Sequence, residues 1–262
     1  MRQNPAIQHI FVERAHFSVR GVLPGPSGYE LFQPLRSIVL GPGTELDSSL
    51  SQAKLTDIPS LESIQILVDD DPKACAFMFA DTPGRVPFPN LKVFRCHSPL
   101  GVELLRCIVG PAARSGRLEV LDLSVGDKSH WFRTNVQPVG ICPEVDLAFT
   151  ACKSLRTIGL SDFNWGENTP ARFDAQPFVD WVAMHPDVDT VACYPKNPTY
   201  DAFFPTLSAL FRKAPKVKVV YEESLASFQW DAAKEMADRH GVRLVRSKGG
   251  MPAIWEGLDD EF

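Results

Sequence analysis

A six-residue phrase that recurs along the chain is the feature that most constrains its fold. Each copy has large apolar residues at its first, fourth and sixth positions, with small or polar residues mostly between them. The clearest copies are Leu-Arg-Ser-Ile-Val-Leu at 35–40, Leu-Glu-Ser-Ile-Gln-Ile at 61–66, Leu-Glu-Val-Leu-Asp-Leu at 118–123 and Leu-Arg-Thr-Ile-Gly-Leu at 155–160. Recurrence at a nearly steady interval predicts one structural unit stacked many times.

Weaker copies fill the intervals between the clear ones. Units start near residues 7, 35, 61, 91, 118, 155, 188, 217 and 242. A turn-forming pair often precedes the phrase, as at Pro59-Ser60 and Pro89-Asn90. Helical spacing of apolar residues follows several units, at 101–115, 173–185, 200–213 and 227–240, with Gly241 as the expected cap of the last helix. Phrase and spacing together are typical of a leucine-rich repeat, so we expect one irregular repeat domain over residues 1–262.

Eight or nine strand-then-helix units also describe a (β/α)8 barrel, and the strand composition separates the two folds. Barrel strands are covered on both faces and are nearly continuous apolar runs. Here polar residues such as Ser37, Gln65 and Asp122 occupy the alternate positions. We therefore expect an α/β solenoid, with a curved parallel sheet and helices on its convex side, and we keep the barrel as the alternative.

The ninth position of a leucine-rich repeat usually holds Asn or Cys, whose side chain joins neighbouring loops. This chain lacks that ladder, because the corresponding residues are Ala15, Gly43, Asp69, Pro99, Gly126 and Phe163. The first strand begins near residue 7, which leaves no room for a capping unit before it. Either residues 1–25 form an improvised cap, or the chain is a fragment of a longer protein.

Composition and motifs exclude several classes of function. The net charge of -5 argues against a nucleic-acid partner, and neither a membrane span nor a signal peptide is present. Cys96 and Cys193 fall at inward positions, so we expect reduced, buried thiols in an intracellular protein, cytoplasmic or nuclear. The nucleophile-elbow, phosphate-loop and metal-ligand motifs are all missing. We interpret Asp69-Asp70-Asp71 as an exposed turn, and expect no catalytic residue, no metal and no cofactor.

Two groups of residues are candidates for contact with a protein partner. Aromatic residues follow the strands of the longer units, where extra length in a solenoid often forms the binding face, and aromatic residues are common interface anchors. They are Trp131, Phe163, Trp165 and Tyr194. The third and fifth positions of each strand should be exposed on the concave face, where Arg95 and Asp122 form a charged pair near the middle. The aromatic residues would equally serve as local core covering the strand edges.

The helix-to-strand joins Phe178-Val-Asp-Trp-Val-Ala-Met-His-Pro186 and Leu210-Phe-Arg-Lys-Ala-Pro215 carry a family resemblance. With the irregular repeats, they resemble the leucine-rich-repeat region of fungal F-box-type proteins. The resemblance implies that the repeats recruit a substrate to a ubiquitin ligase. The F-box segment that such proteins use to join the ligase is not found in this sequence.

The function that we expect is therefore a non-enzymatic scaffold that binds another protein. Two alternatives remain open: an enzyme on a βα barrel with acidic residues at the strand ends, and a scaffold that self-assembles through its uncapped N-terminal edge.

Overall fold

The protein is described from a computed structural model, which defines residues 7–17, 35–41, 43–46, 58–67, 88–96, 110–124, 152–164, 176–196, 200–222, 225 and 227–246. Nine strands within these ranges form one parallel sheet. They are β1 (His9–Val12), β3 (Ser37–Leu40), β5 (Ser63–Ile66), β6 (Val93–Cys96), β7 (Val120–Ser124), β8 (Thr157–Asn164), β9 (Thr190–Lys196), β10 (Val219–Glu222) and β11 (Arg243–Arg246). All nine strands that the repeat predicts are thus confirmed.

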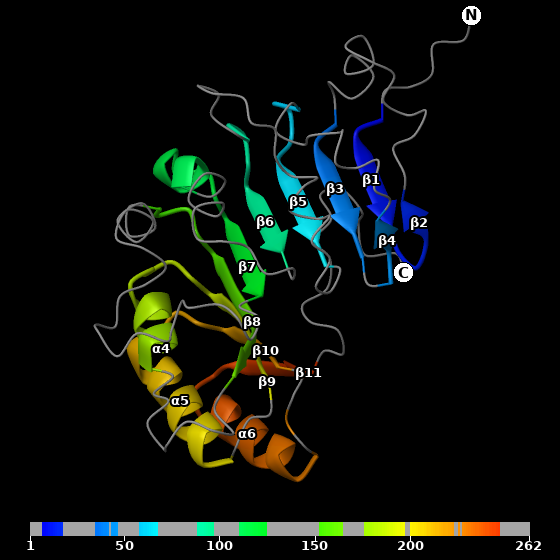
Figure 1. Cartoon of the computed structure of the whole chain (residues 1–262). Coiled ribbons are helices and arrows are strands. Elements are labelled where there is room, and N and C mark those ends of the chain that lie inside the picture. The colour runs from blue at the N-terminus through cyan, green and yellow to red at the C-terminus, as the bar shows by residue number, and fades with distance from the viewer. Residues whose placement is uncertain are drawn as a thin grey trace, which may run out of the picture.

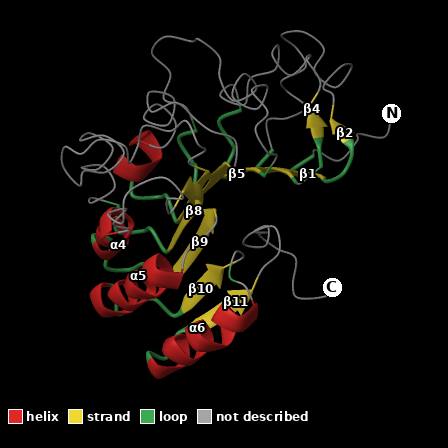
Figure 2. Cartoon of the chain, turned by 60° about the horizontal axis from the view of Figure 1, so that its bottom comes forward, coloured by secondary structure: helices red, strands yellow, loops and turns green. Residues whose placement is uncertain are grey.

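Each strand pairs with the strand of the next unit, in the order β1-β3-β5-β6-β7-β8-β9-β10-β11. Eight of the nine start at the third position of the predicted phrase, and equivalent positions pair across the sheet, for example Ile38 with Ile64. The strands follow an arc, and β1 and β11 lie at its opposite edges (Figures 1 and 2). The sheet is open, so the barrel alternative is wrong. Two further strands, β2 (His16–Phe17) and β4 (Glu45–Leu46), form a small separate parallel pair.

Three helices lie on the outer side of the arc (Figure 2). They are α4 (Gln176–Ala183), α5 (Tyr200–Lys213) and α6 (Ser227–Arg239), and each joins one strand to the next. These bounds agree with the predicted helices to within three residues at each end. Within the predicted 101–115 helix the structure describes 110–115, of which 110–114 are helical. Because all three crossovers pass on the same side, the sheet is wound as a solenoid is, with its helices on one face.

The core lies between the sheet and the helices. In the inner units, residues at the first, fourth and sixth repeat positions are almost completely buried there, as Leu61, Ile64 and Ile66 illustrate. Trp181 of α4 and Phe211 of α5 belong to the same cluster. Cys96 and Cys193 occupy sixth positions and are buried free thiols, as predicted. Burial of these apolar side chains is the main force that holds the units together, since isolated strands and helices of this length are marginally stable in water.

The last unit departs from the predicted phrase by one residue. Leu244 pairs with Val220, so Leu244 and not Val245 takes the inward fourth position. The cause is the turn after α6. Gly241 adopts a left-handed φ of 66°, and Val242 donates its N–H to the Ala237 carbonyl. This geometry is a Schellman cap, which confirms Gly241 as the cap and shortens the entry into β11.

Candidate functional site

The concave face, which is the sheet face opposite α4–α6, carries the third and fifth repeat positions. The sequence predicts that it is exposed along its length, but among the described residues it is exposed only toward its two edges, at Phe11 of β1, which is 48% accessible, and at Arg243 of β11. Toward the middle, both positions are buried. The fifth-position row runs through Val39, Gln65, Arg95, Asp122, Gly159 and Ala192 on neighbouring strands.

The prediction that Arg95 and Asp122 are exposed for a partner is therefore wrong. Both side chains have 0% accessibility. The Arg95 Nε–H donates to Asp122 Oδ2 at 3.0 Å, and Arg95 Nη1–H donates to Gln65 Oε1 at 3.0 Å. Gln65 Nε2 in turn donates to Ser63 Oγ at 3.3 Å. A buried charge is tolerated when it is paired, and this chain of contacts over three strands pairs the two charges through Asp122 Oδ2.

The space for the Asp122 carboxylate comes from Gly159 on the next strand. The two residues are direct partners in the register of β7 and β8. A methyl group at residue 159 would overlap that carboxylate and would lie 2.8 Å from the Asp122 Cβ. Val93, Val120 and Ala192 pack beside this polar row as a second, smaller apolar cluster. The row fixes the register of the central strands, and it offers no solvent-facing charge to a partner.

The structure describes two of the four aromatic residues that the sequence analysis predicts as partner contacts. Trp131 and Trp165 lie outside the described residues. Phe163 and Tyr194 lie within β8 and β9, so both belong to the sheet and not to loops beyond it. Ser161 pairs with Tyr194, and a register irregularity follows in β8 before Asn164 pairs with Lys196. The sheet thus brings Phe163 and Tyr194 to the carboxyl ends of two neighbouring strands.

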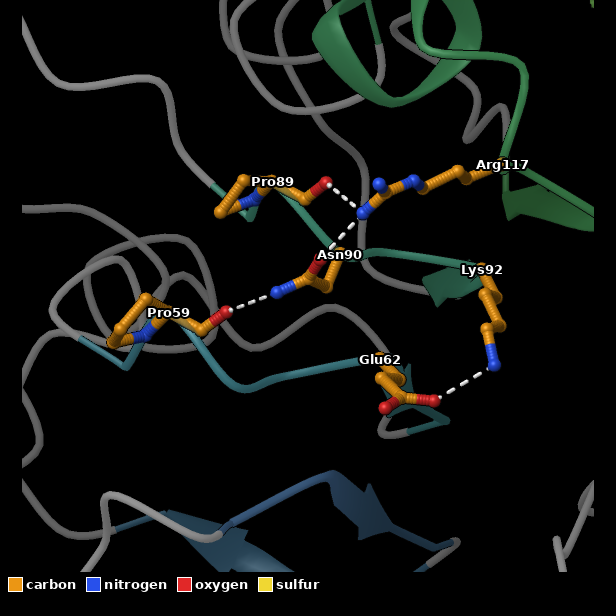
Figure 3. A network of polar contacts seen from close by, with 6 residues as sticks. All are labelled: Pro59, Glu62, Pro89, Asn90, Lys92 and Arg117. Atoms are coloured by element: carbon orange, nitrogen blue, oxygen red, sulfur yellow. Dashed lines mark hydrogen bonds and ion pairs between the residues drawn. The ribbon is translucent and has the colours of Figure 1, made fainter.

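A ladder of polar contacts joins the turns before the strands, and the sequence analysis missed it. Its members stand directly before the first repeat position. Asn90 Nδ2 donates to the Pro59 carbonyl at 3.0 Å, and Arg117 Nη1 donates to Asn90 Oδ1 (Figure 3). Elsewhere Ser60 donates to the Leu35 carbonyl, Ser154 donates to the Leu118 carbonyl, and Lys216 pairs with Asp187 at 2.7 Å. This turn ladder links neighbouring units, as the missing ninth-position ladder would.

Charges of alternating sign occupy the second repeat position along the same edge. They are Arg36, Glu62, Lys92, Glu119, Arg156, Asp189 and Lys218. Each of these residues from Glu62 onward donates its backbone N–H to the carbonyl of the preceding one. Lys92 and Glu62 form an ion pair at 2.8 Å (Figure 3). The alternation is legible in the sequence once the phrase is aligned, and it places unlike charges on adjacent strands, which favours this register.

Among the described residues, three titratable side chains have contacts that serve the fold. His185 is buried at the end of α4, and its Nδ1 lies 2.9 Å from the Trp181 carbonyl. The Lys216 ammonium, through its hydrogen bond and its charge, lowers the pKa of Asp187. Burial, with the nearby Glu222 carboxylate, raises the pKa of the Cys193 thiol. Within the same residues, no three His, Cys, Asp or Glu side chains are grouped to hold a metal ion.

A search of the sequence against protein-family models and curated proteins gives no significant match. Within the part of the chain that the structure defines, no helix has both the length and the apolar character needed to cross a membrane.

Proposed function

We propose that this protein is a leucine-rich-repeat solenoid that acts as a non-enzymatic scaffold for binding another protein. The observation that supports the proposal is the nine-strand open sheet, in which every unit pairs only with its neighbours in a common register. Repeat arrays of this kind present a long surface whose residues recur at fixed intervals, and that surface is suited to macromolecular partners. The resemblance to F-box-type repeats suggests a specific form of this role, the recognition of substrates for a ubiquitin ligase.

The location of the docking face follows from what is buried. Because Arg95 and Asp122 are enclosed, the middle of the concave face does not supply the charged contacts that we first expected. The remaining predicted contacts are Phe163 and Tyr194, which lie toward the carboxyl ends of β8 and β9, and Trp131 and Trp165, which follow β7 and β8 in the sequence. Large aromatic side chains are frequent anchors of protein interfaces, and they remain our candidates.

Capture from a lysate of the source organism tests the proposal. Tagged wild-type protein is compared with a Trp131→Ala/Trp165→Ala variant, and Met184→Ala is the control because it removes an exposed apolar side chain at the end of α4. We expect one stoichiometric protein that the double variant loses and the control keeps. Recovery of a ubiquitin-ligase adaptor would support the F-box-like role. A wild-type sample that retains no protein partner would contradict the scaffold proposal.

A second candidate function is self-assembly through β1. The consensus apolar residues of the first unit are less buried than those of the inner units. Ile7 is 49% accessible, whereas its equivalents Leu35 and Leu61 are 1% and 0% accessible. Exposed apolar residues on an edge strand favour association with another chain. Sedimentation velocity tests this idea: a mass that grows with concentration, and that Ile7→Lys/Phe11→Lys abolishes, would support it, whereas a constant monomer mass would exclude it.

A further inference from the structure

Exposed cations are concentrated along the edge at which β7 to β11 begin. We call this set the basic rim. It consists of Arg114, Arg117, Lys153, Arg156, Arg212, Lys213, Lys216, Lys218, Arg239 and Arg243, all of them solvent-exposed. The carboxylates of Glu119, Asp187, Asp189 and Asp238 lie among them. The rim therefore has an excess of positive charge, although the chain as a whole has a net charge of -5.

Topology explains why these residues share one edge. Parallel strands all begin at the same edge of a sheet, and the helices that return the chain to that edge end there. Figure 1 shows the carboxyl ends of α5 and α6 leading directly into β10 and β11. Neighbouring strands are about 4.8 Å apart, so the four intervals from β7 to β11 give a charged stripe of roughly 19 Å.

Part of this charge has a structural explanation. Lys213 pairs with Asp180, and Arg239 pairs with Glu235. Arg212 and Lys213 also lie in the last turn of α5, where cations interact favourably with the helix dipole.

Lys216 is also paired, with Asp187, but three other cations of the rim have no such explanation. Lys218 and Arg243 belong to strand entries, and Lys153 belongs to a turn, so none of them caps a helix. No ion pair joins these three side chains to any residue that the structure describes. Lys218 follows Asp189 in the second-position row, and the Lys153 charge acts on Asp187, so both cations have a carboxylate near them, but the rim as a whole keeps more cations than carboxylates.

We propose that the basic rim binds an acidic polypeptide segment of a partner protein. This inference rests on the proposed scaffold function and adds the chemistry of one contact. Charge complementarity selects the partner, since complementary potentials steer association and determine specificity. Nucleic acid fits less well, because a phosphate at every nucleotide would face Glu119, Asp187 and Asp189. A polypeptide can place a neutral or basic residue opposite each of these carboxylates.

Fluorescence anisotropy with two labelled probes tests the proposal. One probe is a peptide in which ten glutamates alternate with serines, and the other is a single-stranded oligonucleotide of equal charge. We expect saturable peptide binding that weakens as salt rises, because exposed charges are screened over about 10 Å at 0.1 M salt. The Lys218→Glu/Arg243→Glu variant should bind the peptide with an affinity that is lower by on the order of tenfold, since each substitution reverses a rim charge.

Arg14→Glu/Arg36→Glu is the matched control, because it reverses two exposed charges in the first two units, and three strand intervals of about 4.8 Å separate β3 from β7. It should leave peptide affinity within about twofold of the wild type, since charges more than a Debye length away are screened. Circular dichroism checks that each variant folds, and all four substituted side chains are exposed. Equal weakening by control and rim variants, tighter binding of the oligonucleotide, or no saturable peptide binding would overturn the proposal.

The lysate experiment separates failure of this inference from failure of the scaffold function. If the rim variant still captures the partner that the wild type captures, the scaffold function stands and the rim inference falls. If the wild type captures no protein but binds the glutamate peptide through the rim, the rim chemistry stands and the scaffold proposal loses its support.

Discussion

The buried Arg95–Asp122 pair allows a quantitative test of the concave face. Arg95→Met keeps much of the side-chain length and removes the charge, so the Asp122 carboxylate loses a buried ion-pair partner at 3.0 Å. Removing one partner of a buried pair costs about 3–5 kcal/mol, because the remaining charge stays desolvated. Domains unfold with free energies of about 5–15 kcal/mol, so the variant should lose a large share of its stability.

The companion variant is Arg95→Met/Asp122→Leu, which removes both charges and keeps the branched shape of the Asp122 side chain. Replacing a buried pair with apolar residues is often close to neutral, so the double variant should recover about 2 kcal/mol or more of the loss. Urea unfolding followed by circular dichroism measures both effects. With a slope near 2–3 kcal/mol/M, Arg95→Met should lower the midpoint by about 1–2 M.

A small effect would refute this reasoning. If Arg95→Met costs less than about 1 kcal/mol, and the double variant is no more stable than the single one, then the pair behaves as an exposed surface pair. The concave face would then be accessible to solvent, and Arg95 and Asp122 would again be candidates for contact with a partner.

Three further predictions concern single positions. Gly159→Ala should destabilise the protein by about 1–3 kcal/mol in urea unfolding, because the added methyl group collides with a buried carboxylate, whereas Gly110→Ala, whose methyl would lie nearest to the flexible end of Arg114, should be close to neutral. The pKa of Asp187 is lowered by Lys216, so their contact stabilises the fold fully above the ordinary carboxyl pKa and is lost as the pH falls through the lowered value. Carbon-detected NMR titration should therefore show the Asp187 pKa rising toward its ordinary value in Lys216→Met, and an unchanged value would contradict the assignment. Because its pKa is raised by burial, Cys193 should resist iodoacetamide at pH 8 in the folded protein and react in urea, as peptide mass spectrometry can determine, and rapid labelling of the native thiol would contradict its burial.

The sequence by itself determined the units, their order and their inward faces. A large apolar residue at positions one, four and six requires a strand with a buried side, and the interval between copies leaves room for a connection back to the same edge. For this reason Leu61, Ile64 and Ile66 could be assigned to the core before the structure was known. Helical periodicity fixed α5 in the same way, since both ends of Tyr200–Lys213 were predicted.

Only the tertiary structure decided the rest, because it depends on which residues meet across strands. Polar residues at alternate positions predict a solvent-facing surface, yet Arg95 is buried and donates hydrogen bonds to the equally buried Asp122 and Gln65. Gly159 matters because it stands opposite Asp122, and periodicity within one strand carries no information about that neighbour. The turn ladder and the basic rim arise likewise from residues about 30 positions apart, such as Asn90 and Pro59. Periodicity reports which side of its own strand a residue occupies, whereas the register of neighbouring strands sets its partners, its burial and the charge of the shared edge.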